Sequence, residues 1–109
     1  MKKHVVHVDV RVGADGIVCS PDPVKVTSRN ALVNFHLKSD GYRFRDKDAI
    51  VVYEPQRDFP YPSWTVKPTQ ATLLDLDNST ASYAYSVYLV DTKSGKEVSV
   101  DPTIENRPE

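Results

Sequence analysis

Apolar and polar residues alternate with a period of two along most of this chain. In the first segment, His7, Asp9 and Arg11 separate four valines, at positions 6, 8, 10 and 12. Successive side chains of a β-strand point to opposite faces of the sheet. The pattern therefore predicts a strand over residues 6–12 with one buried face and one solvated face.

Similar short segments follow at residues 17–19, 24–26, 31–37, 42–44, 72–76, 83–90 and 98–100. The run 50–53 is apolar throughout and is typical of a strand buried on both faces. Turn residues separate these segments, and no window of a dozen residues has helical spacing. Seven or eight short strands in one domain, residues 1–109, predict an all-β antiparallel β-sandwich, with a barrel as the alternative.

The charge pattern narrows the function classes. The chain has 14 basic and 15 acidic side chains and a formal net charge of -1, without long blocks of one sign. This argues against binding to nucleic acid or to an anionic membrane surface. No apolar run approaches the roughly 20 residues that span a bilayer, and the N-terminus lacks the apolar core of a signal peptide. A single cysteine allows no internal disulfide, so we expect a cytoplasmic protein.

Candidate metal and nucleophile residues are few. His4 and His7 have opposite strand parity, and no histidine follows Cys19 at the short spacing of a copper site. Cys19 stands without a catalytic motif and is interpreted as a small buried hydrophobe. No glycine-rich phosphate loop is present. We therefore expect no metal and no cofactor.

Residues 54–64 combine three prolines with Phe59, Tyr61 and Trp64. Prolines favour extended backbone in the residues before them, so this segment is predicted to be an ordered loop. Its aromatic side chains have two interpretations. They form a recognition surface, because aromatic residues give contact area at low entropic cost, or they cap one end of the sandwich.

Asp101-Pro102 follows the strand predicted at residues 98–100. Proline cannot donate a hydrogen bond to a neighbouring strand, so the plain interpretation is a turn that ends the strand. The chemical alternative is self-cleavage. An aspartate side chain can reach its own peptide carbonyl and close a five-membered ring, and burial of the carboxyl would favour this reaction.

The dipeptides Glu54-Pro55 and Asp101-Pro102, with the strand at residues 83–89 between them, resemble the DP-EP family of small bacterial proteins. The resemblance implies an immunoglobulin-like β-sandwich that cleaves itself after the aspartate of its C-terminal Asp-Pro. Asp101 would then be the catalytic and scissile residue, and Pro102 would lie on the leaving side. Residues 102–109 would stay bound as a strand.

This chain differs from the DP-EP family pattern at one position, which weakens the inference from the resemblance. The cross-link that the resemblance implies needs a lysine early in the strand at residues 83–89, where this chain has Ser82, Tyr83 and Ala84. Lys93 and Lys96 lie in the next hairpin loop, so we expect no isopeptide bond.

Two functional hypotheses follow. The first is a binding or structural module that contacts an unknown protein, or a second copy of itself, through residues 54–64 or an exposed edge strand. The second is a domain that cleaves its own Asp101-Pro102 bond.

Overall fold

The computed structural model describes residues 4–54 and 58–108, and this part of the chain contains eleven β-strands joined by turns and loops. These residues include no helix that could cross a membrane. The strands are β1 (Val5–Gly13), β2 (Gly16–Ser20), β3 (Val24–Val26), β4 (Ala31–Leu37), β5 (Tyr42–Phe44), β6 (Ile50–Val52), β7 (Trp64–Lys67), β8 (Gln70–Asp75), β9 (Ala81–Asp91), β10 (Glu97–Val100) and β11 (Thr103–Asn106).

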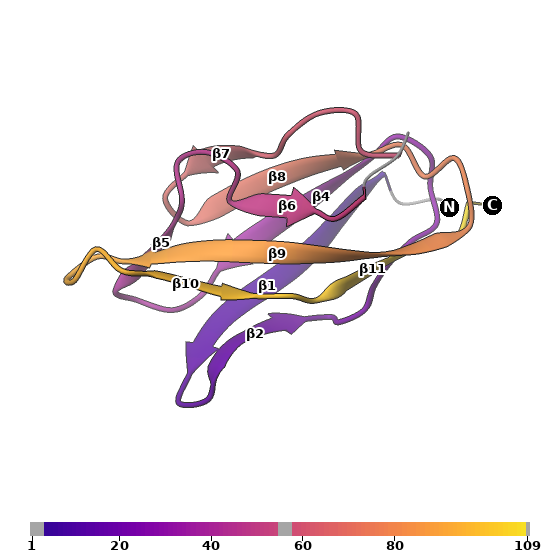
Figure 1. The fold of residues 1–109 in the computed structure, drawn as a ribbon. Helices are drawn as coiled ribbons and strands as arrows, with labels where there is room; N and C mark the ends of the chain where they lie inside the picture. The colour runs from indigo at the N-terminus through magenta and orange to yellow at the C-terminus, as the bar shows by residue number, and fades with distance from the viewer. Residues whose placement is uncertain (1–3, 55–57, 109) are drawn as a thin grey trace.

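The strands form two packed sheets, which confirms the predicted all-β sandwich (Figure 1). One sheet has the order β2-β1-β4-β8-β7. The other is organised around β9, the longest strand. β5 and β6 pair with β9, as do β10 and β11, and β3 continues the sheet beyond β11.

Both sheets are mixed, whereas the sequence pattern predicted antiparallel pairing and seven or eight strands. β1 pairs with β4 in parallel, and β11 pairs with β3 in parallel. Alternation reports only that one face of a strand is buried, and this is equally true of both pairing directions. The pattern therefore could not reveal the two parallel pairs.

β10 and β11 are two halves of one strand along β9. Val100 pairs with Val87 and Thr103 pairs with Ala84. The register is continuous across the gap, so Asp101 and Pro102 stand opposite Ser86 and Tyr85. Because proline has no N–H, it interrupts the pairing without ending the course of the chain.

The core contains the inward residues of both sheets. On β4 and β9 the predicted inward positions are buried: Ala31, Val33, Phe35, Leu37, Tyr83, Tyr85, Val87 and Leu89. The rings of Phe35 and Tyr85 pack across the two sheets with centroids 5.6 Å apart. The apolar run 50–53 differs from its prediction, because Tyr53 lies outside β6 and is 47% exposed.

Candidate functional site

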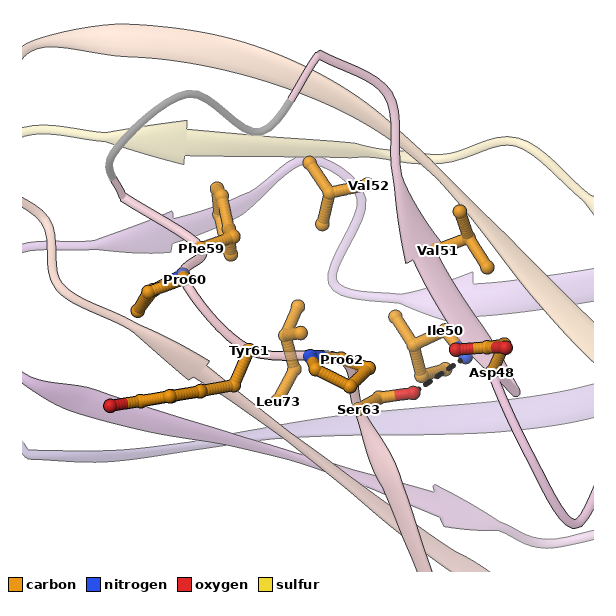
Figure 2. A pocket seen from close by; sticks show the side chains of 10 residues that line it. All are labelled: Asp48, Ile50, Val51, Val52, Phe59, Pro60, Tyr61, Pro62, Ser63 and Leu73. Atoms are coloured by element: carbon orange, nitrogen blue, oxygen red, sulfur yellow. Dashed lines mark hydrogen bonds between the residues drawn. The ribbon is translucent and has the colours of Figure 1, made fainter.

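An apolar pocket lies between β6 and residues 59–63 (Figure 2), with a volume of about 220 Å³. Ile50, Phe59 and Leu73 are buried side chains that line its interior. Val52 and Tyr61 also line the pocket. These contributions come from β6, from β8 and from the proline-rich loop.

The prolines explain why the pocket stays open. Pro60 and Pro62 have no N–H, so this stretch cannot pair fully with β6 as another strand would. A side chain replaces part of the missing pairing, because the Ile50 N–H donates to Ser63 Oγ at 3.1 Å. At the other end of the loop, the Leu76 N–H donates to the Asp58 carbonyl oxygen at 2.7 Å. The loop is therefore anchored at both ends while a gap remains beside β6.

The three aromatic residues of this segment have different environments. Phe59 is 5% exposed and packs edge-on against Tyr83, with ring centroids 4.9 Å apart. Of the two interpretations of this segment, the buried ring of Phe59 fits the cap, and the same ring lines the interior of the pocket. Tyr61 lines the pocket and is 63% exposed. Trp64 is 48% exposed on β7, paired in register with Thr72, and it does not line the pocket.

Among the described residues that line the pocket, Asp48 has the one charged side chain. Its backbone is left-handed, with φ of 53°. The Arg45 guanidinium holds this turn by donating to the carbonyl oxygens of Lys47 at 2.9 Å and of Asp48 at 2.7 Å. The pocket thus has an apolar interior and an exposed carboxylate at a fixed place on its edge.

Asp101 is at the end of a chain of two hydroxyl groups. The buried Ser86 Oγ donates to Asp101 Oδ1, and the Tyr53 hydroxyl is hydrogen bonded to the same Ser86 oxygen. Serine has one hydroxyl proton, so with that proton on the Asp101 bond the Tyr53 hydroxyl donates to Ser86. Pro102 is buried, and its carbonyl oxygen accepts from the Tyr85 N–H at 3.0 Å.

This environment differs from the buried carboxyl that self-cleavage was expected to use, because Asp101 is exposed. Within residues 4–54 and 58–108, no lysine forms an ion pair with Asp101. Glu54 has a left-handed backbone with φ of 48°. Its partner in the Glu54-Pro55 dipeptide, Pro55, lies outside the described residues.

Cys19 and the histidines were weighed as ligands or nucleophiles in the sequence. Burial, with a smaller contribution from Asp22, raises the pKa of the Cys19 thiol to about 12, so the reactive thiolate is scarce. His7 Nδ1 lies 2.9 Å from His36 Nε2 on the neighbouring strand, while His4 lies apart from them and contacts the Arg29 carbonyl oxygen. The described part of the chain holds no group of three or more His, Cys, Asp or Glu side chains that could bind a metal ion.

Sequence reasoning missed the pocket and the two hydroxyls beside Asp101. The pocket combines β6, β8 and the proline-rich loop, whose packing no local pattern encodes. Ser86 had one usable signal, since it is a polar residue in the centre of an otherwise apolar and aromatic strand.

No family model matches this chain, and no curated protein matches it by sequence. Among solved structures, the fold is similar to that of the cysteine protease inhibitor EhICP2 from Entamoeba histolytica. The match covers 97% of this chain and 98% of the other, with 13% sequence identity and a TM-score of 0.42. A similarity at this level says nothing about function.

Proposed function

We propose that this protein is a binding module whose pocket beside β6 receives one apolar side chain of an extended protein segment. The observation that carries the proposal is an open apolar pocket bordered by the highly exposed ring of Tyr61. An aromatic side chain beside such a pocket offers a large contact area at little cost in conformational entropy.

The size of the pocket favours a side chain over a small-molecule ligand. Its volume of about 220 Å³ is below the roughly 300–1,000 Å³ of ordinary ligand pockets. An apolar side chain would fill the space between Ile50 and Leu73. The Asp48 carboxylate would favour an arginine or lysine next to that side chain in the partner.

Selection of random linear peptides on the immobilised protein tests this proposal. We expect the selected peptides to share one apolar anchor residue. Val52→Phe fills the pocket and should weaken their binding by about tenfold or more, and Tyr61→Ser by about fivefold or more.

Two matched variants serve as controls. Val18→Phe makes the same substitution at an exposed position of β2, in the other sheet. Trp64→Ser removes an exposed aromatic side chain outside the pocket. Both should bind the peptides like the wild type, and equal binding by the Val52→Phe variant would contradict the proposal.

Self-cleavage at Asp101-Pro102 is a second candidate, favoured by the Tyr53–Ser86–Asp101 hydrogen bonds and by the resemblance to the DP-EP family. These hydroxyls would orient the Asp101 carboxyl toward its own peptide carbonyl. The tail would remain bound after cleavage, because β11 pairs with both β9 and β3 and its Ile104 side chain is fully buried.

The denatured intact mass, followed over days at mildly acidic and neutral pH, tests this candidate. Cleavage predicts two species that divide the chain between residues 101 and 102, and Ser86→Ala should slow their appearance. A single persistent species near 12.3 kDa would mean that Asp101-Pro102 only interrupts a strand.

We propose a cytoplasmic location, on the basis of a single free and buried cysteine.

A further inference from the structure

Three buried aspartates meet at one end of the sandwich, and none of them lines the pocket. Asp58 precedes the proline-rich stretch, Asp75 ends β8, and Asp77 follows in the turn toward β9. Their side chains are between 0% and 2% exposed. The C-terminal strand joins this group through Asn106, which is also fully buried.

Asn106 links β11 to two of the carboxylates. Its side-chain Nδ2 donates to Asp75 Oδ1 at 2.8 Å and to Asp58 Oδ2 at 3.1 Å. On the same strand, Ile104 is fully buried in the core and Glu105 forms an ion pair with Arg107. The amide of Asn106 is therefore the polar contact that fixes β11 in the cluster.

The three carboxylates differ in the number of hydrogen bonds that they accept. Asp58 accepts hydrogen bonds from the Asn78 N–H and from the side chains of Ser79, Tyr83 and Asn106. Asp75 Oδ2 and both carboxylate oxygens of Asp77 are buried without a partner in the described structure. An ionised carboxylate buried without donors is far more costly than a neutral carboxyl group, so Asp75 and Asp77 favour the protonated form.

We propose that protonation of this cluster controls the docking of β11, which stays closed while Asp75 and Asp77 are neutral and opens more often as they ionise. Opening removes Asn106 from between the carboxylates and admits water, which stabilises the ionised forms. It also uncovers the edges of β9 and β3, and unpaired edges are templates for pairing with another chain.

The charged and titratable groups around the cluster support this direction. The pKa of Asp75 is raised to about 7, chiefly by burial and to a smaller extent by the charges of Asp77 and Asp58, while the hydrogen bonds from Asn106 and from the Asp77 N–H act in the opposite direction. Burial and Asp58 raise the pKa of Asp77 to about 6, while Arg29 acts in the opposite direction. Tyr83 is a further titratable neighbour among the described residues, and burial and Asp58 raise its pKa.

The sign of the effect follows from linkage. The folded-state pKa values of Asp75 and Asp77 lie above the unfolded value of about 3.9. Their contribution to closure is therefore complete below about pH 4 and is lost as the pH rises toward 7.

Hydrogen exchange of the full-length protein at about pH 5.5 and about pH 8, corrected for the intrinsic exchange rate, tests the proposal. We expect the opening of β11 to be about tenfold or more frequent at the higher pH, because one pKa unit corresponds to a tenfold change in the equilibrium. The corrected exchange rates of the β4 amides should change much less between the two pH values. Equal changes in β4 and β11 would overturn the proposal, because the cluster would then act on the whole fold.

The same exchange experiment is repeated with two variants of the cluster and with added calcium ions. Asp75→Asn and Asp77→Asn remove the titrating groups and should flatten the pH dependence of β11, whereas Asp15→Asn, in the exposed β1–β2 turn, should leave it unchanged. An unchanged pH dependence in both cluster variants would overturn the proposal. Restoration of β11 protection at the higher pH by added calcium chloride would also overturn it, because the cluster would then be filled by a cation rather than by protons.

Discussion

Asp58 shows how donors can outweigh burial at a single residue. Burial acts to raise the pKa of this carboxyl, but hydrogen bonds from Asn78, Tyr83, Asn106 and Ser79 together hold its pKa below the ordinary value. Asp75, with fewer donors, has a raised pKa in the same cluster. The donors therefore keep Asp58 ionised at a neutral pH where Asp75 is still partly protonated.

We predict that Asp58→Asn lowers the free energy of unfolding by about 2–3 kcal/mol, since hydrogen bonds to a charged group are lost and an amide N–H₂ meets other donors. Urea denaturation at neutral pH measures this loss. Tyr83→Phe removes one of the donors and should cost about 1 kcal/mol. The contribution of Asp58 is present above about pH 4 and fades as the pH falls further, so an Asp58→Asn loss that is undiminished in acid would contradict this account.

At the scale of the element, the proline-rich loop is both part of the core and part of the proposed binding site. Phe59 packs under the loop, whereas Tyr61, two residues further on, is exposed at the pocket. The sequence offered the core cap and the recognition surface as alternatives for the whole segment. The structure assigns the cap to Phe59 and leaves Tyr61 available for contact.

Substitutions in this loop should therefore separate stability from binding. Phe59→Ala should lower the free energy of unfolding by about 3–5 kcal/mol, because it leaves a cavity next to Tyr83. Tyr61→Ser should change it by about 0.5 kcal/mol or less, because that ring is mostly in solvent. Thermal or urea unfolding measures both variants, and comparable losses in the two would contradict the assignment.

Much of the element pattern could be predicted from the sequence, because period-two alternation directly reports a half-buried strand. The inward faces of β4 and β9 follow this rule residue by residue. Three features could not be predicted in this way. The parallel partners of β1 and β11 depend on long connections, and β7 begins at Trp64, the last residue of the predicted loop, and was not expected. Ser86 meets Asp101 only through the register of distant strands.

At the scale of the whole molecule, β9 connects the three regions of interest. Val52 of the pocket pairs with Tyr85, Asp101 lies opposite Ser86, and Ile104 of the C-terminal strand pairs with Tyr83. Neighbouring residues on a strand point to opposite faces. One face of β9 therefore packs in the core, and the other face contacts Asp101 through Ser86. Both the pocket and the C-terminal strand thus depend on the position of one central strand.

The central claim is that the pocket beside β6 binds an apolar side chain of a partner. Methyl-resolved NMR of the wild-type protein, on addition of a selected peptide, tests it most directly. The account predicts that the largest shift changes occur at the methyl groups of Ile50, Val52 and Leu73, with none at Val18. Shift changes centred instead on Val66, near Trp64 on the outer face of the other sheet, would contradict it.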